Sequence, residues 1–394
     1  MSRDVFVVGA GMIPFKKPGA GDTYSVMAAT AIREALSDAK LSYDQIEHAY
    51  AGYAYGDTCS GQRAIYDVGA TAIPVFNVNN ACATGSSALY LARQAVASGQ
   101  VECALAVGFE QMNPGALGTM FDDRPSVYDH FDTCIESKLD VTNIPLAMRL
   151  FGSAGLEHMK RFGTKLETFA KIRAKASRHA SNNPLALFKK VVTEEEVMAS
   201  PVLWPGVMTR LMACPPTCGA AAAIVTSADF AKRHNLRSEV KIAAQAITTD
   251  SASTFDNNDL RGVAGYYMAQ TAAKKVYEAA GIGPEDIDVI ELHDCFAQNE
   301  LLTYESLGLC AEGEAEKLVL DGDNTYGGKY VTNPSGGLLS KGHPIGATGL
   351  AQCFELVNQL RGEAEARQVP NARLALQHNI GIGGACVVTL YERV

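Results

Sequence analysis

An internal repeat constrains the fold of this 394-residue chain more than any other feature of the sequence. Thr30–Ala35 (TAIREA) matches Thr271–Val276 (TAAKKV), and Asp44–Glu47 (DQIE) matches Glu285–Asp288 (EDID). Both matches have the same offset of 241 residues. A repeated order of elements at a fixed spacing predicts two halves of similar topology.

Strand-like and helix-like runs alternate along the first half. Short apolar or β-branched runs, typical of strands, occur at 5–9, 46–53, 73–78, 103–108 and 219–225. Residues 24–39 have the spacing of an amphipathic helix. This alternation predicts βαβ units and a mostly parallel sheet. The pattern changes at 113–206, so we expect a first half at 1–112 and 207–235, an inserted domain at 113–206 and a second half at 236–394.

Cys82 lies in a turn between a predicted buried strand, 73–78, and a predicted helix that contains 88–96. The residues around it, 79–85 (NNACATG), are small or polar, so a substrate carbonyl could approach the sulfur closely. Unpaired N–H groups at a helix N-terminus favour a thiolate and can donate to an oxyanion. We therefore expect a nucleophile with a depressed pKa, although a single cysteine is more often a small buried hydrophobic residue.

The second half has a comparable glycine-rich turn, 336–350, which contains His343 and leads into a predicted helix. If a pseudo-twofold axis relates the halves, His343 lies across it from Cys82. Two other predicted strands end in segments of interest: 288–292 runs into His293–Phe296 (HDCF), and 374–379 runs into the glycine loop 380–384. Taken singly, each histidine is more often a hydrogen-bonded structural residue.

Composition argues against several classes of protein. The formal charge of −9 argues against nucleic-acid binding, and no apolar run is long enough to span a membrane. Ten cysteines without an export signal indicate reduced thiols in the cytoplasm, and the close pair Cys214 and Cys218 has no matching pair, so we expect no metal site. Residues 160–190 hold nine Lys or Arg and one acid, Glu167. This segment is either a docking site for an anion or a solvated helix face.

These motifs together, in this order and over nearly the whole chain, resemble the thiolase family, and within it the thiolase domain of sterol carrier protein X. The residues that carry the resemblance are Asn79-Asn80 with Cys82, the basic insertion, His293–Phe296, Gly342-His343-Pro344 and Gln377–Gly381. Where this chain has His293–Phe296, most thiolases have Asn-Glu-Ala-Phe. They also have a catalytic cysteine two residues before the glycine that corresponds to Gly381. The sterol-carrier branch has both departures, as this chain does with Cys295 and Asn379.

The resemblance implies an α/β thiolase fold, in which two duplicated βαβαβαββ halves form a five-layered αβαβα core and an inserted loop domain covers CoA. It also implies a homodimer, acyl-CoA substrates, and CoA as a co-substrate with no permanently bound cofactor. The reaction would be the CoA-dependent cleavage of a 3-oxoacyl-CoA into acyl-CoA and acetyl-CoA or propionyl-CoA, or the reverse condensation, through an acyl-cysteine.

The resemblance also implies a role for each side chain of the site. Cys82 would be the nucleophile and His343 the base that activates it. His293 and His343 would hold the thioester oxygen of the enolate. Cys295 would protonate the enolate and later deprotonate the incoming CoA.

Backbone and basic groups would complete the site. The N–H groups of Cys82, Gly381 and Gly383 would hold the oxygen at the ketone carbon. The phosphates of CoA would meet three basic side chains of the insertion, Lys171, Arg173 and Lys175.

Two departures and three rival functions remain. Cys218 stands where the branch usually has aspartate, and the sterol-binding domain of animal members is not in this sequence, so lipid transfer is not implied. A decarboxylating ketosynthase also uses one cysteine and two histidines, but Cys295 argues against it. A non-catalytic acyl-CoA-binding or lipid-binding scaffold would need neither Cys82 nor Cys295, and a retro-aldolase of thiolase ancestry would not require Cys82.

Overall fold

The computed structural model describes residues 3–115, 121, 123–141, 143–256 and 259–394. Ten strands form one twisted sheet in the order β10-β9-β11-β12-β8-β1-β7-β4-β2-β3, and β5 and β6 form a separate pair. The ten-stranded order is symmetric about its centre, where β1 and β8 meet through the single pair Phe6 and Lys241. The predicted duplication is therefore confirmed as two five-stranded halves.

The first half follows the order βαβαβαββ, with one short extra helix at its end. Its elements are β1 (Val5–Met12), α1 (Tyr24–Ala39), β2 (His48–Gly52), α2 (Ser60–Tyr66), β3 (Val75–Val78), α3 (Thr84–Ala97), β4 (Cys103–Glu110), β7 (Gly219–Ser227) and α8 (Ala228–Arg233).

The second half repeats this order with additional short helices. Its elements are β8 (Val240–Thr248), α9 (Ala252–Asp256), α10 (Leu260–Val263), α11 (Tyr266–Ala280), β9 (Val289–Glu291), α12 (Ala297–Ser306), α13 (Ala315–Leu320), β10 (Val331–Thr332), the π-helical turn η4 (Gly337–Lys341), α14 (Thr348–Arg361), β11 (Leu374–Gly381) and β12 (Ala385–Arg393). Gly362 ends α14 in the left-handed conformation, with φ of 77°, which glycine adopts without steric cost.

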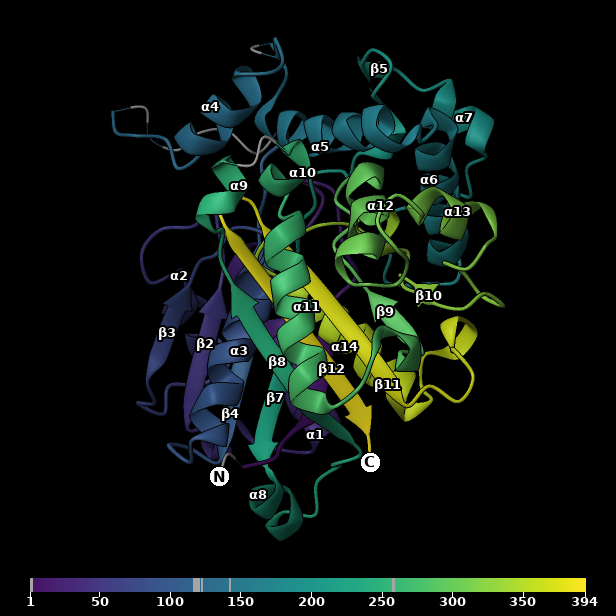
Figure 1. Cartoon of the computed structure of the whole chain (residues 1–394). Coiled ribbons are helices and arrows are strands. Elements are labelled where there is room, and N and C mark those ends of the chain that lie inside the picture. The colour runs from purple at the N-terminus through teal and green to yellow at the C-terminus, as the bar shows by residue number, and fades with distance from the viewer. Residues whose placement is uncertain (1–2, 116–120, 122, 142, 257–258) are drawn as a thin grey trace.

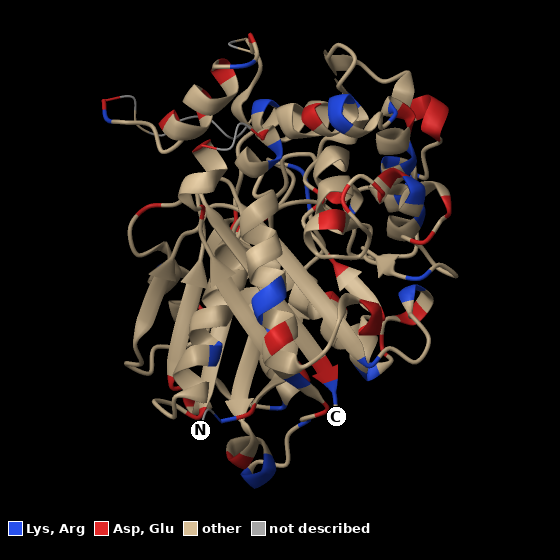
Figure 2. Ribbon diagram, in the orientation of Figure 1, with Lys and Arg blue, Asp and Glu red and all other residues tan. Residues whose placement is uncertain are grey.

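The layers follow from which helices pack on which strands. α3 and α14 pack against each other and lie between the two halves of the sheet. α1 covers β1 and β7 on one outer face, and α11 covers β8 and β12 on the other (Figure 1). This arrangement is the five-layered αβαβα core expected from the resemblance. Charged side chains lie mainly on the helices and loops, and most strands are free of them (Figure 2).

Two expectations about the sheet are corrected. The sheet is not mostly parallel, because β7 pairs antiparallel with both β4 and β1, and β12 does the same with β11 and β8. β3 is not buried, because it pairs only with β2 at the end of the sheet, and its Phe76 is 44% exposed. An apolar run of strand length does not reveal whether the strand will lie at an edge.

The segment between β4 and β7 holds the helices at the top of Figure 1. Its elements are α4 (Asp129–Glu136), α5 (Leu146–Phe162), α6 (Leu166–Ala180), α7 (Glu194–Met198), β5 (Val202–Trp204) and β6 (Met208–Thr209). α6 packs on α12 and on η4 of the second half. The division into domains at 1–112 with 207–235, 113–206 and 236–394 stays a prediction. Within the described ranges, no helix has both the length and the apolar character needed to cross a membrane.

Candidate functional site

Cys82 lies in the predicted turn between β3 and α3, and α3 begins two residues later at Thr84. The residue before it, Ala81, has a φ of 46°, a conformation that non-glycine residues adopt at a cost of about 1–3 kcal/mol and that occurs often at functional sites. The Cys82 side chain is 5% exposed. The turn is closely covered by the loop after β11, since a Cβ on Gly381 would lie 2.0 Å from the Asn80 carbonyl oxygen. Only glycine allows this approach.

Burial controls the acidity of Cys82. Burial raises the pKa of the thiol to about 12, and the nearby charge of Glu110 raises it as well. The N–H of Ile382, which donates to the sulfur, has the opposite effect. The expectation of a depressed pKa is therefore wrong, because desolvation of the thiolate outweighs the dipoles of the helix terminus. Cys82 stays a thiol at neutral pH until a base removes its proton.

Both predicted histidines converge on Cys82. The Cys82 sulfur and one ring nitrogen each of His293 and His343 all lie within 4.8 Å of one another. The two imidazole rings have centroids 5.1 Å apart and are nearly perpendicular. The three residues come from segments up to 261 positions apart, so the pseudo-twofold arrangement brings them together as expected.

The two histidines are held through their Nδ1 atoms. Nδ1 of His343 lies 2.6 Å from the hydroxyl of Thr348, and Nδ1 of His293 lies 2.9 Å from the side-chain nitrogen of Asn379. Nε2 of each ring is buried without a hydrogen-bond partner among the described residues. Burial lowers the pKa of His343 to about 3 and holds that of His293 well below its usual range. Both rings are therefore neutral, and each has an unused Nε2 that can serve a substrate.

Cys295 lies in the segment between β9 and α12 and is 3% exposed. Burial raises its pKa well above the ordinary value, and the neighbouring Cys214 and Cys82 raise it further. Cys214 lies directly across from Cys295, since its N–H donates to the Cys295 carbonyl oxygen at 2.9 Å. All ten cysteines are free. The predicted second thiol is thus protonated and within electrostatic reach of the nucleophile.

The backbone donors differ in detail from the expected ones. The N–H that donates to the Cys82 sulfur belongs to Ile382, between the predicted Gly381 and Gly383. Gly383 and Gly384 have φ of 94° and 105°, which favour glycine and turn the chain back into β12. The roles of the Cys82, Gly381 and Gly383 N–H groups toward a substrate oxygen stay predictions.

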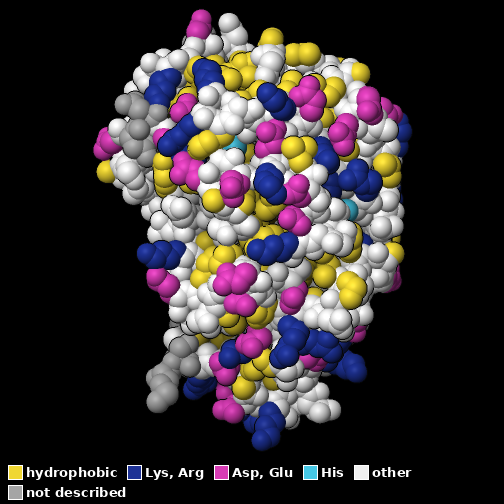
Figure 3. Space-filling model, turned by 45° about the vertical axis from the view of Figure 1, so that its right-hand side comes forward, with side chains coloured by type: hydrophobic (Ala, Val, Ile, Leu, Met, Phe, Trp, Pro, Cys, Tyr) yellow, Lys and Arg dark blue, Asp and Glu magenta, His cyan; other side chains and the backbone are white. Residues whose placement is uncertain are grey.

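Two of the three expected CoA contacts are corrected. Lys175 is 2% exposed and forms an ion pair with Glu300, and Arg173 is 3% exposed and donates to the Ser340 hydroxyl at 2.6 Å. Both side chains point from α6 into the second half, where Lys175 has a charged partner and Arg173 a hydroxyl group. Only Lys171 is partly exposed. On the face seen in Figure 3, Lys and Arg side chains are interspersed with Asp and Glu.

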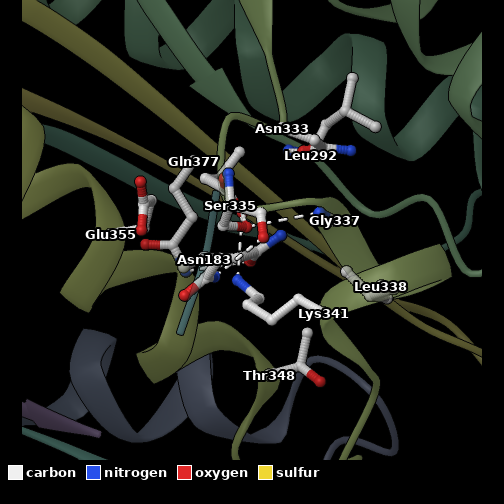
Figure 4. Close-up of polar contacts among 12 residues, drawn as sticks. Asn183, Leu292, Asn333, Ser335, Gly337, Leu338, Lys341, Thr348, Glu355 and Gln377 are labelled. Carbon is white, nitrogen blue, oxygen red and sulfur yellow. Dashed lines mark hydrogen bonds and ion pairs between the residues drawn. The ribbon is translucent and has the colours of Figure 1, made fainter. Parts of the chain in front are cut away.

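Acidic side chains fix the loop that carries His343. Glu291 accepts from the N–H and hydroxyl of Ser335, at 3.0 and 2.7 Å, and from Lys341 at 3.3 Å. Figure 4 shows Lys341 pointing into this group, beside Asn183, which donates to the Ser335 carbonyl at 2.9 Å. Asp294 accepts from the Leu338 N–H at 2.7 Å. The segment with His293 and Cys295 is therefore tied to the segment with His343.

Sequence reasoning missed Glu110 and the position of Cys214. Glu110 ends β4, is fully buried, and accepts the N–H groups of Ala54, Tyr55 and Gly346 at 2.9–3.0 Å. It ties the first half to the turn after His343, and burial raises its pKa to about 6. A carboxylate at the end of an apolar strand was the available signal. No local pattern around Cys214 indicates that it would lie beside Cys295.

Comparison with known proteins gives the family. Residues 5–192 match the model described as "Thiolase, N-terminal domain", and residues 247–391 match "Thiolase C-terminal domain-like". "Sterol carrier protein 2" of Oryctolagus cuniculus is 53% identical over 98% of this chain and 72% of that protein. "Benzoylsuccinyl-CoA thiolase subunit BbsB" of Thauera aromatica is 33% identical over 97% of this chain and 96% of that protein.

Solved structures agree on the fold. A structure titled "Ltp2-ChsH2(DUF35) aldolase" has a TM-score of 0.83 and 21% identity, covering 100% of this chain and 98% of that one. Human mitochondrial 3-ketoacyl-CoA thiolase in complex with CoA has a TM-score of 0.74 and 20% identity, covering 100% and 98% of the two chains. The matched domain models, the identities over almost the whole chain and the duplicated fold around Cys82 lead to one conclusion: this chain belongs to the thiolase family.

Proposed function

We propose that the protein is an acyltransferase that cleaves 3-oxoacyl-CoA with CoA as co-substrate, through an acyl group on Cys82. One observation carries the proposal. The Cys82 sulfur lies within 4.8 Å of a ring nitrogen of both His293 and His343, and both Nε2 atoms lack a partner among the described residues. A nucleophile, a base and a hydrogen-bond donor are thus gathered in one buried place.

The first half-reaction uses these groups in turn. Nε2 of His343 removes the Cys82 proton while the sulfur adds to the C3 ketone of the substrate. The C2–C3 bond then breaks and its electron pair passes to the thioester, forming an enolate. Nε2 of His343 now carries a proton, so it donates to the enolate oxygen together with His293. Cys295 gives its proton to C2, acetyl-CoA or propionyl-CoA leaves, and the shortened acyl group stays on Cys82.

The second half-reaction returns the enzyme to its starting state. The Cys295 thiolate takes the proton of the incoming CoA thiol, whose sulfur attacks the acyl group on Cys82. The Cys82 sulfur leaves and recovers its proton from His343. Every proton is accounted for without an external acid or base. Both half-reactions depend on Cys295, which acts as an acid in the first and as a base in the second.

The rival functions have weaker support. A ketosynthase has no use for a protonated Cys295 beside the nucleophile. A relative is named for sterol carriage and a structural neighbour is titled an aldolase. In this chain, however, Cys82 lies close to both histidines, and Cys295 is within electrostatic reach of Cys82. A scaffold without turnover or a retro-aldolase has no need of that arrangement.

The test is a CoA-dependent cleavage assay with straight, 2-methyl-branched and steroid-derived 3-oxoacyl-CoA substrates. We expect loss of at least one substrate, and mass spectrometry after incubation without CoA should find the acyl group on Cys82. The Cys82→Ala variant is the control and should form no adduct. No cleavage of any substrate in the panel refutes the proposal, and release of carbon dioxide from malonyl thioesters would identify a ketosynthase instead.

A homodimer is also proposed, through the exposed edge of β3. That strand has an unpaired edge, and Phe76 and the nearby Tyr66 are 44% and 60% exposed. Exposed strand edges with apolar side chains readily pair with another chain. Sedimentation equilibrium should give twice the chain mass, and the Phe76→Asp variant should shift it toward the monomer. A monomeric wild type contradicts the assignment.

A further inference from the structure

Nε2 of both His293 and His343 is without a partner among the described residues, but the partners of the two Nδ1 atoms differ in kind. A neutral imidazole has one N–H, and the partner of one nitrogen decides which nitrogen carries it. The partner of His293 Nδ1 is the amide group of Asn379, whose oxygen accepts hydrogen bonds and whose nitrogen donates them. The orientation of this amide therefore decides what His293 offers to a substrate.

A chain of hydrogen bonds fixes the direction, beginning at the Gly349 carbonyl. A carbonyl oxygen only accepts, so the Gln377 amide turns its Nε2 toward it, at 2.6 Å. The oxygen of the same amide accepts from the Tyr391 hydroxyl at 2.5 Å, which agrees with this orientation. The second Nε2 proton of Gln377 is donated to Ser86 Oγ at 2.8 Å.

Ser86 passes the direction on to Asn379. The Ser86 hydroxyl lies 2.8 Å from the Asn379 side-chain oxygen, and the described part of the chain offers its proton no other acceptor. The Asn379 oxygen therefore faces Ser86, and its NH₂ group faces His293 Nδ1. Because that NH₂ donates, Nδ1 must be unprotonated, and the single proton of the ring lies on Nε2.

We propose that Gln377, Ser86 and Asn379 are positioning residues that lock His293 in the Nε2–H tautomer, so that it enters the reaction as a hydrogen-bond donor. The assigned donor role rests on the proposed function, whereas the tautomer does not. His343 has the opposite arrangement: Thr348 donates its hydroxyl proton to the Pro344 carbonyl at 2.9 Å and so accepts from Nδ1–H. Its Nε2 is left as an acceptor, as a base requires.

The lock connects the two halves of the molecule. Ser86 lies in the first turn of α3, directly after Cys82, whereas Gln377 and Asn379 lie on β11 of the second half. The helices are in close contact there, because a Cβ on Gly349 of α14 would lie 2.1 Å from Ser86 Oγ. The helix that follows the turn of Cys82 thus also sets the protonation of the histidine from the other half.

The direct test is ¹⁵N NMR of protein labelled at histidine, without substrate, since ring-nitrogen shifts separate protonated from unprotonated nitrogens. His293→Gln and His343→Gln variants assign the signals. We expect the His293 proton on Nε2 and the His343 proton on Nδ1. A His293 proton on Nδ1 in the wild type overturns the proposal, whether or not the protein cleaves 3-oxoacyl-CoA. The expected tautomers in a protein without thiolysis would contradict only the proposed function.

Two variants test how the lock works. Asn379→Asp replaces the donor by an acceptor of the same shape, so His293 Nδ1 should become protonated; an Nδ1 that stays unprotonated contradicts the mechanism. Ser86→Ala frees the Asn379 amide to turn over, so protonated Nδ1 should appear and kcat should fall by up to about 100-fold, the loss expected for one oxyanion donor, with KM little changed. Ser153→Ala is the control, since its buried hydroxyl donates to the Leu150 carbonyl of its own helix and to no other group among the described residues. A response of Ser86→Ala equal to that of this control overturns the role of Ser86.

Discussion

The Gly337→Ala substitution tests whether Asp294 is a rigid support between His293 and Cys295. Gly337 begins η4, the turn that leads to His343, with a φ of 58°. A Cβ added there would lie 2.1 Å from a carboxylate oxygen of Asp294. Asp294 is fully buried and accepts the Leu338 N–H, so it cannot yield without breaking contacts. The Gly337→Ala variant should therefore push against the segment that carries two proposed catalytic residues.

The magnitude has two parts. A non-glycine residue in the left-handed region costs about 1–2 kcal/mol. Forcing a methyl group into a packed interior costs about another 1–3 kcal/mol. Gly322 is a matched control, because its φ is 76° and no heavy atom lies within 4 Å of a Cβ built there. Gly322→Ala should carry only the cost of the left-handed conformation, so the two variants should differ by roughly 1–3 kcal/mol in the free energy of unfolding.

Urea denaturation followed by circular dichroism measures this difference, and a thiolysis assay measures its effect on the site. A displacement of about 1 Å at reacting groups can lower a rate by about 100-fold, so kcat should fall strongly in Gly337→Ala and stay near wild type in Gly322→Ala. If the two variants are equally stable and equally active, Asp294 is not a rigid support, and the reasoning from this contact is refuted.

Two further predictions concern single side chains. Cys295→Ala should still accept an acyl group on Cys82 from a simple thioester, but should cleave 3-oxoacyl-CoA on the order of 100- to 10,000-fold more slowly, the usual loss for an acid/base group; normal cleavage would assign the proton to another thiol or to water. Lys171→Glu should raise the apparent KM for CoA at unchanged stability, and an unchanged KM would show that the exposed part of α6 is only a solvated face. Lys175→Met should instead lower the free energy of unfolding by about 3–5 kcal/mol, because it leaves the buried Glu300 without its ion-pair partner.

The fold was predictable where local pattern and duplication agree. The strands and helices around Cys82, His293 and His343 lie within a few residues of their predicted bounds, because each has a clear apolar period and ends in glycine or small residues. The repeat then placed the two turns opposite each other. What local pattern does not contain is the position of a strand within the sheet. For this reason β3 was expected to be buried and the sheet was expected to be mostly parallel.

The site was predictable to the extent that its residues lie in recognisable motifs. The prediction that Arg173 and Lys175 contact CoA was wrong because their partners, Ser340 and Glu300, are more than 120 residues away in the sequence. The sequence of their own helix does not indicate these partners. The hydrogen bonds that orient His293 also join distant residues. The groups that we propose to react lie in motifs that the sequence displays, whereas the groups that hold them are apparent only in the structure.

The raised pKa of Cys82, corrected from the sequence expectation, changes how the nucleophile must act. With the Cys82 pKa raised to about 12 and that of His343 lowered to about 3, the resting pair is a thiol and a neutral imidazole rather than an ion pair. Proton transfer must therefore accompany formation of the carbon–sulfur bond. In the proposed reaction the imidazolium is then matched by negative charge on the ketone oxygen of the substrate. After the C2–C3 bond breaks, it is matched by the enolate oxygen, to which the Nε2–H of His293 is also proposed to donate. The same burial that disfavours charge before substrate binds strengthens this pairing, so in the proposed reaction the site stabilises the transition state more than the ground state.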